Sequence, residues 1–134
     1  MQFKEFTPRV IVRRDYQACY DFYTEKLGFV PTYGDRNGPY TGFAMRAGEA
    51  ACFAIFAGAD MAKFKGYVQP TTNEQPDTVV ASLFSEDVEA DYKKMKEAGV
   101  DFIGELQLME WGAKHVNFRD PEGNLLELTD GSAG

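Results

Sequence analysis

Histidine and cysteine are scarce in this 134-residue chain, which contains one histidine and two cysteines. Cys19 and Cys52 form no CxxC pair, and two thiols of a reducing compartment usually stay free. A zinc site built on them would need two further ligands, and the chain offers only one imidazole. The sequence therefore gives no support to a fold held together by disulfides or by zinc.

Long apolar runs and an excess of positive charge are also missing. No run approaches the roughly 20 residues of a membrane span, and the opening residues MQFKEFTPRV lack the apolar stretch of a signal peptide, so we expect a cytoplasmic protein. A net charge of −7 disfavours nucleic acids and anionic membranes as partners, because both attract basic surfaces. Phosphate-binding glycine loops, nucleophile elbows and HExxH patterns are absent.

Apolar and aromatic residues are plentiful, at 44% and 14% of the chain, which is enough for a packed core in one domain of this length. Apolar periodicity and turn residues predict a strand, a helix and three strands, and then the same order again. The predicted strands are 7–13, 29–33, 41–46, 51–56, 78–85, 100–106, 113–119 and 124–129, and the predicted helices are 16–27 and 87–98.

The repeat is clearest in the two predicted helices, which end at Gly28 and Gly99. Four residues recur at a spacing of 72 positions, Asp15, Ala18, Tyr20 and Glu25 matching Asp87, Ala90, Tyr92 and Glu97. The repeated order of elements predicts an α+β domain with eight mainly antiparallel strands and two flanking helices. We expect one domain over residues 1–134, with module one at about 5–56, a connector at 57–77 and module two at about 78–130.

Two motifs resemble those of the glyoxalase/bleomycin-resistance (vicinal oxygen chelate) superfamily. The stretch FYTEKLGF at 22–29 resembles the end of the first helix, and FRDPEGNLLEL at 118–128 closely resembles the last hairpin. Trp111-Gly112 is similar to bleomycin-resistance-like members. The resemblance covers roughly residues 5–130. It implies two βαβββ modules whose sheets curl around an eight-stranded cup, and a homodimer with each cup near the subunit interface.

Metal-dependent members of the superfamily hold a divalent ion through the first and fourth strands of each module. Carried over position by position, these ligand sites fall at Pro8, Ala54, Val80 and Glu127. Only Glu127 has a side chain that can donate a lone pair, and a single carboxylate binds such an ion weakly. The resemblance therefore implies a protein that has lost most of the metal ligands, and we expect neither a metal nor another cofactor.

Strand alternation from these four positions predicts the other residues that face the cup. The additional residues are Val10, Cys52, Phe56, Ser82, Leu125 and Thr129. A turn centred on Glu122 places Asn117 opposite Glu127. It also places His115 opposite Thr129, so that a polar strip of His115, Asn117 and Glu127 runs through an apolar cavity.

Several of these residues have more than one interpretation. His115 suits contact with a ligand or acid–base chemistry, but a lone histidine in a strand is also a common structural residue. Glu127 can accept from Asn117 or from a ligand amine, and Arg9 can pair with it in some registers only. Trp111 can stack on a planar ligand or belong to a rim or a dimer interface. The predicted ligand-binding residues are His115, Asn117, Glu127, Trp111, Pro8, Cys52, Ala54, Phe56, Val80 and Ser82.

Three functions remain open at this stage. The first is a metal-free binding protein that sequesters an apolar or aromatic small molecule, the mechanism by which such a protein would confer antibiotic resistance. The second is an enzyme, either a glyoxalase-like lyase or isomerase or a divergent metal-dependent enzyme, using His115 and Glu127. The third is a structural or regulatory domain with a filled cup, which the small Ala54 and Ser82 disfavour. We expect the binding protein.

Overall fold

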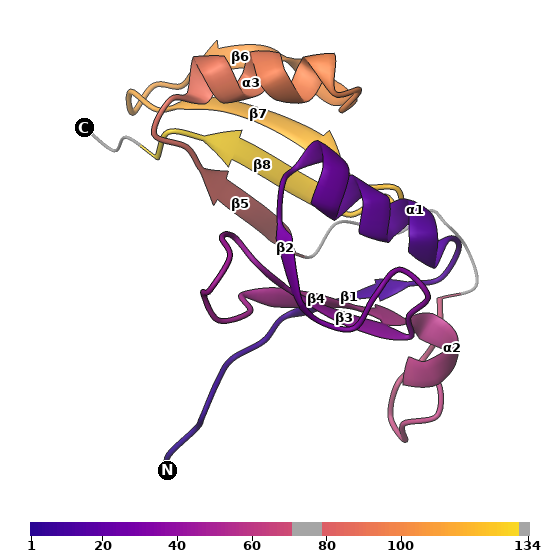
Figure 1. Cartoon of the computed structure of the whole chain (residues 1–134). Coiled ribbons are helices and arrows are strands. Elements are labelled where there is room, and N and C mark those ends of the chain that lie inside the picture. Colours follow the sequence, from indigo (N-terminus) through magenta and orange to yellow (C-terminus); the bar gives the residue numbers. More distant parts are fainter. Residues whose placement is uncertain (71–78, 132–134) are drawn as a thin grey trace. The chain divides into compact units, whose positions relative to one another are not determined.

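Two four-stranded sheets organise the chain, one in each of two units, Met1–Thr72 and Asn73–Gly134. The computed structural model shown in Figure 1 describes residues 1–70 and 79–131. The end of the predicted connector and the first residue of the predicted strand 78–85 lie outside this part. The two units are called module one and module two and are described separately.

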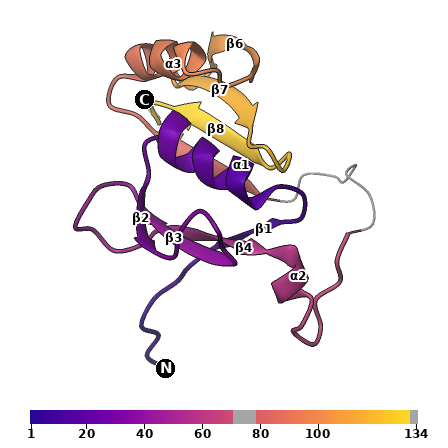
Figure 2. The ribbon, with the colours of Figure 1, turned by 45° about the vertical axis from the view of Figure 1, so that its right-hand side comes forward.

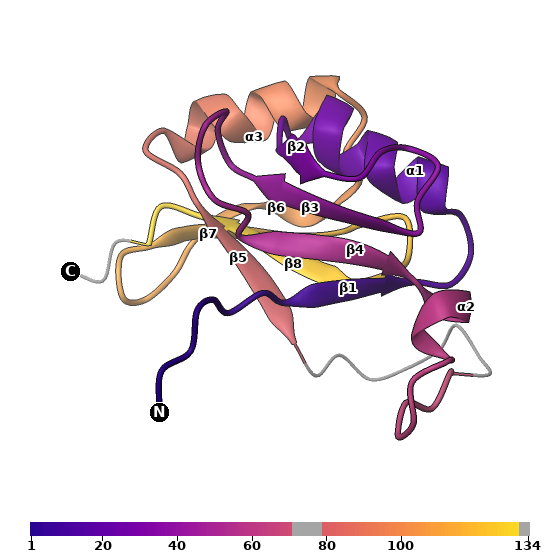
Figure 3. The ribbon, with the colours of Figure 1, turned by 60° about the horizontal axis from the view of Figure 1, so that its bottom comes forward.

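Module one has a mixed sheet in the order β1-β4-β3-β2, in which β1 runs parallel to β4 and the other neighbours are antiparallel. Figure 3 shows α1 lying along this sheet. A short helix, α2, follows β4, and the N-terminal residues run out from β1 as an extended segment (Figure 2). The elements are β1 (Arg9–Val12), α1 (Tyr16–Asp21), η1 (Phe22–Lys26), β2 (Val30–Tyr33), β3 (Tyr40–Ala44), β4 (Phe53–Ala57) and α2 (Gly58–Met61).

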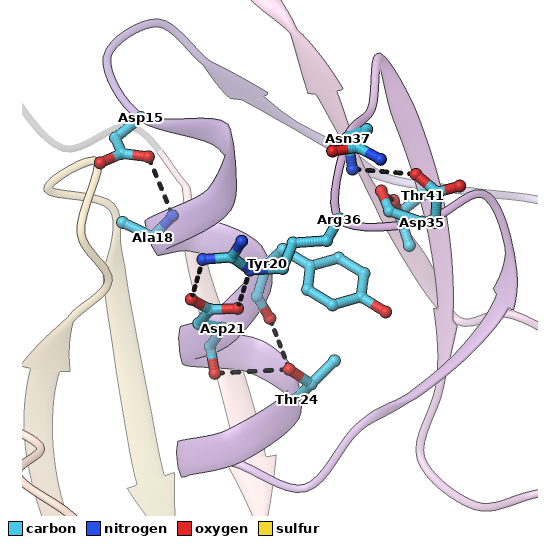
Figure 4. Close-up of polar contacts among 9 residues, drawn as sticks. All are labelled: Asp15, Ala18, Tyr20, Asp21, Thr24, Asp35, Arg36, Asn37 and Thr41. Atoms are coloured by element: carbon cyan, nitrogen blue, oxygen red, sulfur yellow. Dashed lines mark hydrogen bonds and ion pairs between the residues drawn. The ribbon is translucent and has the colours of Figure 1, made fainter.

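Short polar contacts hold α1 in place (Figure 4). Asp15 is its N-cap, as its position in the sequence predicts, and accepts a hydrogen bond from the Ala18 backbone N–H at 3.0 Å. Farther along, Arg36 from the β2–β3 connection binds both carboxylate oxygens of Asp21, at 2.8 and 2.9 Å. The hydrogen bond from this guanidinium lowers the pKa of the Asp21 carboxyl.

The first predicted helix does not keep α-helical geometry to its end. After α1 the backbone widens into the π-helical turn η1, where the Leu27 N–H donates to the Phe22 carbonyl five residues earlier. The Thr24 hydroxyl donates to the Tyr20 carbonyl at 2.8 Å in the same stretch. The wider turn brings two consecutive rings, Phe22 and Tyr23, into the core, where both are buried.

The core of module one is an aromatic cluster between the helix and the sheet. Phe43 on β3 is fully buried, and its ring centroid lies 5.8 Å from that of Tyr20, 5.9 Å from that of Tyr23 and 5.3 Å from that of Phe53. Tilted and edge-on ring pairs at these distances stabilise a core beyond simple area burial. The aromatic richness of the sequence is thus concentrated where the helix meets the sheet.

Module two repeats the topology of module one. Its sheet has the order β5-β8-β7-β6, again with one parallel pair, β5 and β8, and two antiparallel pairs. The helix α3 lies along it (Figure 1). The elements are β5 (Val80–Phe84), α3 (Val88–Glu97), β6 (Phe102–Leu108), β7 (Lys114–Arg119) and β8 (Leu125–Thr129).

One face of this second sheet forms the core with α3. Phe118 is fully buried on β7, and its ring contacts Phe102 on β6, which in turn contacts Tyr92 of α3. The residues that alternate with these along each strand lie on the other face of the sheet, which turns away from α3. The buried residues of this core include Val116, Phe118, Leu126 and Leu128 from the strands and Val88 and Met95 from α3.

The start of α3 provides a test of local stability. Asp87 is the N-cap, and its carboxylate accepts from the Ala90 N–H at 3.1 Å. We expect Asp87→Ala to lower the free energy of unfolding by about 1 kcal/mol, because one N–H of the first turn loses its acceptor. Denaturant titration measures the loss. Asp87→Ser restores a capping oxygen and should recover most of the stability; equal losses in both variants would contradict the capping role.

The turn between β7 and β8 fixes the register of these strands. The Asp120 carboxylate accepts from the backbone N–H groups of Glu122 and Asn124, both at 2.9 Å, and the Gly123 N–H donates to the Asp120 carbonyl. Gly123 has a φ of +86°, a conformation that glycine adopts without strain. The Asp120 side chain of the DPEG sequence therefore closes the predicted hairpin.

The predicted fold class is confirmed: the chain is α+β, with two βαβββ modules and mixed, mainly antiparallel sheets. Two details differ. The eight strands form two separate hydrogen-bonded sheets, and one cup shared by both modules stays a prediction. The predicted connector contains the short helix α2, which the residue pattern does not predict. Within the described residues, no helix has the length and apolarity needed to cross a membrane.

Candidate functional site

The face of the module two sheet that turns away from α3 carries the predicted polar strip. The register pairs Asn117 with Glu127 and His115 with Thr129, as the turn predicted. It also pairs Ser82 with Glu127 across the parallel strands β5 and β8. Residues paired in this way share a face, so Ser82, Glu127, His115 and Asn117 lie together.

Two hydrogen bonds join three of these side chains. The Ser82 hydroxyl donates to Oε1 of Glu127 at 2.8 Å, and Nδ1 of His115 lies 2.5 Å from Oε2 of the same carboxylate. Both carboxylate oxygens are therefore engaged, each from a neighbouring strand. We call Ser82, Glu127 and His115 the polar triad.

The polar triad is partly shielded from water. The side chains of His115 and Glu127 are 21% and 26% exposed, whereas Ser82 is the exposed member of the three. Hydrogen bonds to a charged group in such a setting are stronger than those of fully hydrated groups. The arrangement fixes the orientation of the imidazole, and with its hydrogen on Nδ1 the ring keeps Nε2 as an acceptor.

Asn117 has the place that the predicted register gives it. It lies directly opposite Glu127. In the described part of the chain, however, the partners of the Glu127 carboxylate are Ser82 and His115. The amide of Asn117 therefore stands beside the triad as an additional polar group that a ligand can reach, rather than as the partner that holds Glu127.

Apolar side chains surround the triad on the same face. Val80 and Phe84 flank Ser82 on β5, and Ile103 on β6 pairs with Asn117. These three are unusually exposed for large apolar residues, at 47%, 73% and 53%. A few fixed polar groups within apolar surroundings are the usual composition of a small-molecule site.

In module one the register corrects part of the predicted cup-facing set. Ala54 pairs with Arg9, and Phe56 pairs with Ile11, so the face of Ala54 and Phe56 also carries Arg9. Val10 pairs with Ile55 and belongs to the opposite face, which makes its predicted position wrong. The error has a simple cause, because nothing local to an isolated strand sets which of its two alternating faces points outward.

The other predicted residues of module one lie at the edges of these strands. Pro8 precedes β1, and its carbonyl accepts from the Ala54 N–H. Cys52 precedes β4 and is a free, exposed thiol whose pKa is raised by partial burial. Ala54 itself is fully buried, so its small side chain leaves no solvent-exposed space.

Trp111 lies in the connection between β6 and β7 and is 58% exposed. This placement is compatible with both interpretations of the sequence, stacking on a planar ligand or a place at a rim or a dimer interface. Phe84 and Ile103 were not predicted as site residues. Alternation from Ser82 would have indicated Phe84, but the irregular pairing between β6 and β7 gives no signal in the sequence for Ile103.

The donor set does not fit the divalent ion that the family resemblance implies. The side chains of Pro8, Ala54 and Val80 have no lone pair to donate, so Glu127 is the one side chain at these four positions that can bind a cation, and a single carboxylate binds it weakly. In residues 1–70 and 79–131, no group of three or more His, Cys, Asp and Glu side chains is placed to hold a metal ion.

Comparison with known proteins gives a consistent result. Residues 6–128 match the model of the Glyoxalase/Bleomycin resistance protein/Dioxygenase superfamily. The uncharacterized protein YetH of Bacillus subtilis (strain 168) is 33% identical over 117 residues, which cover 87% of this chain and 89% of that protein.

Solved structures show the same fold at lower sequence identity. A protein of unknown function from Agrobacterium tumefaciens str. C58 has a TM-score of 0.76 at 22% identity, covering 96% of this chain and 95% of its own. A glyoxalase/bleomycin resistance protein/dioxygenase from Nocardioides has a TM-score of 0.71 at 18% identity, covering 99% and 89%.

Proposed function

Because this chain belongs to the Glyoxalase/Bleomycin resistance protein/Dioxygenase superfamily, we propose that it is a metal-free binding protein for an apolar or aromatic small molecule. The ligand lies against the open face of the module two sheet and is oriented by the polar triad. The observation that supports this most directly is the engagement of Glu127 by Ser82 and His115.

The triad suits a ligand that carries a hydrogen-bond donor. A carboxylate has about four acceptor sites, so Glu127 keeps acceptor capacity after its bonds to Ser82 and His115. A ligand N–H or O–H that reaches it forms a charge-assisted hydrogen bond. Val80, Phe84 and Ile103 supply apolar surface for the rest of the molecule, whose burial drives association.

A glyoxalase-like lyase or isomerase is the alternative, and one observation favours it. Glu127 fixes the imidazole of His115 through Nδ1, which leaves Nε2 as the nitrogen that can take up a proton. A base oriented by a carboxylate is a common arrangement in acid–base catalysis. The same geometry serves a binding site, where Nε2 accepts a hydrogen bond from the ligand.

Binding of two matched compounds tests the proposed function. We expect 2-aminonaphthalene, whose amino group can donate to Glu127, to bind more tightly than naphthalene, as measured by calorimetry and thermal shift. Glu127→Gln removes the charge and should weaken binding of the amine by about tenfold, while leaving naphthalene nearly unchanged. Glu97→Gln changes an exposed carboxyl on α3, across the sheet, and should have no effect.

Two results would contradict the proposal. Equal binding of the amine by wild type and Glu127→Gln would show that the polar triad does not contact the ligand. A divalent ion held at stoichiometric amounts by protein purified without chelator, together with loss of binding after chelation, would instead establish a metal-dependent protein with ligands other than those considered above.

A further inference from the structure

Arg9 occupies an unusual position on the open face of the module one sheet. Its guanidinium carbon lies 5.2 Å from the centroid of the Tyr40 ring and 5.6 Å from that of Phe56. The register explains the contact, because Tyr40 pairs with Phe56 across β3 and β4, and Arg9 pairs with Ala54 on the next strand. A cation over aromatic faces at this distance is attracted by their quadrupoles.

No carboxylate neutralises this cation within residues 1–70 and 79–131, although the chain carries a net charge of −7. The contrast with other arginines of the module is clear. Arg36 binds Asp21 through two hydrogen bonds, and Arg46 lies 3.7 Å from Glu49. Arg9 is exposed, and its contacts are with ring faces, which leaves the N–H groups in the plane of the guanidinium available to an anion.

Two further aromatic rings flank the pair that contacts Arg9, so that four rings form a row. Tyr33 contacts Tyr40 at 6.2 Å between centroids, and Phe64 contacts Phe56 at 6.2 Å. The two outer rings are 71% and 54% exposed. Tyr33, Tyr40, Phe56 and Phe64, with Arg9 over the middle pair, form what we call the aromatic row.

We infer that the aromatic row binds a planar aromatic carboxylate. The guanidinium fork matches a carboxylate in geometry and pairs with it through two hydrogen bonds. The neighbouring ring faces offer stacking area to a flat ligand, which a compact anion such as phosphate cannot use. Because the cation–π contacts already orient Arg9, less side-chain entropy is lost when the anion binds. This site lies within module one and does not depend on the proposed function of the polar triad.

The experiment uses 2-naphthoate as the probe and the full chain as the protein. We expect saturable binding of 2-naphthoate at millimolar concentration or below, with a downfield shift of the Arg9 Nε–Hε resonance in NMR spectra. Arg9→Gln should weaken binding by at least about tenfold, because a charge-assisted bidentate pair is lost. Tyr40→Leu keeps the positive charge but removes one ring, and should also weaken binding. Circular dichroism confirms that the variants are folded.

Matched controls separate this site from general attraction between charges. Arg46→Gln removes an exposed arginine of the same module and should leave the affinity unchanged. The neutral 2-naphthamide should bind at least about tenfold more weakly than 2-naphthoate, and inorganic phosphate should not compete. Any of three results overturns the inference: no saturable binding to wild type, equal affinity for acid and amide, or equal losses in Arg9→Gln and Arg46→Gln. Glu127→Gln tests the polar triad separately, so either proposal can fail alone.

Discussion

Phe118→Ala is expected to lower the free energy of unfolding of module two by about 3–5 kcal/mol. The ring is fully buried at the centre of the sheet face that meets α3, in edge contact with Phe102 at 5.5 Å between centroids. Removing it deletes a large apolar group and leaves a cavity that the flanking strands cannot close. Urea titration followed by the fluorescence of Trp111, the single tryptophan, reports on this module.

Phe84→Ala provides the matched control for this prediction. Phe84 lies in the same module and in a strand of the same sheet, but it is 73% exposed. Its truncation should change the free energy of unfolding by no more than roughly 0.5 kcal/mol. If both variants lost similar stability, the assignment of the module two core to the α3 side of the sheet would be wrong.

Gly34→Ala is expected to destabilise module one by roughly 2–5 kcal/mol, the sum of backbone strain and steric overlap. Gly34 has a φ of +80°, and a Cβ built on it would lie 2.0 Å from the backbone carbonyl oxygen of Tyr40. Since a carbonyl within the sheet cannot rotate away as a side chain can, the connection before β3 must move. Far-UV circular dichroism during urea titration measures the loss.

Gly48→Ala separates the steric overlap of an added Cβ from the strain of a left-handed backbone conformation. Gly48 has nearly the same conformation, with a φ of +85°, but a Cβ there meets nothing within 4 Å. This variant should lose only about 1–2 kcal/mol, the cost of a left-handed conformation for an ordinary residue. Equal losses in the two variants would show that the approach of Gly34 to Tyr40 is not what requires glycine.

Local chemistry made most of the fold predictable. Asp15 and Asp87 mark helix starts through their capping bonds, and the DPEG turn fixes β7 against β8 through Asp120. The register of His115 and Asn117 followed from that turn alone. Where a short-range hydrogen bond sets the geometry, the sequence is sufficient to place the side chains on either side of it.

Long-range pairing and weak helix signals account for what was not predicted. The strand β1 pairs in parallel with β4, far along the chain, so no turn sets its alternation and Val10 was placed on the wrong face. The short helix α2 begins at Gly58, a poor helix former, and gave no periodic pattern.

The candidate site shows the same division between local and long-range information. Strand alternation brought Ser82 and Glu127 to one face correctly, and their pairing confirms it. The position of Arg9 over Tyr40 and Phe56 depends on three strands meeting in one register. Such a contact has no local signature, because a cation and two rings at these spacings are common in any sequence.

The place of β8 has a consequence for synthesis of the protein. It lies between β5 and β7 in the sheet, yet the ribosome makes it after every other strand of the module. Ser82 is synthesised 45 residues before Glu127, whose carboxylate accepts its hydrogen bond. Until translation has passed Thr129, β5 has no neighbour in its sheet and its apolar residues stay available to chaperones. The polar strip of His115, Asn117 and Glu127 is therefore completed late in biogenesis, when β8 pairs with β5 and β7.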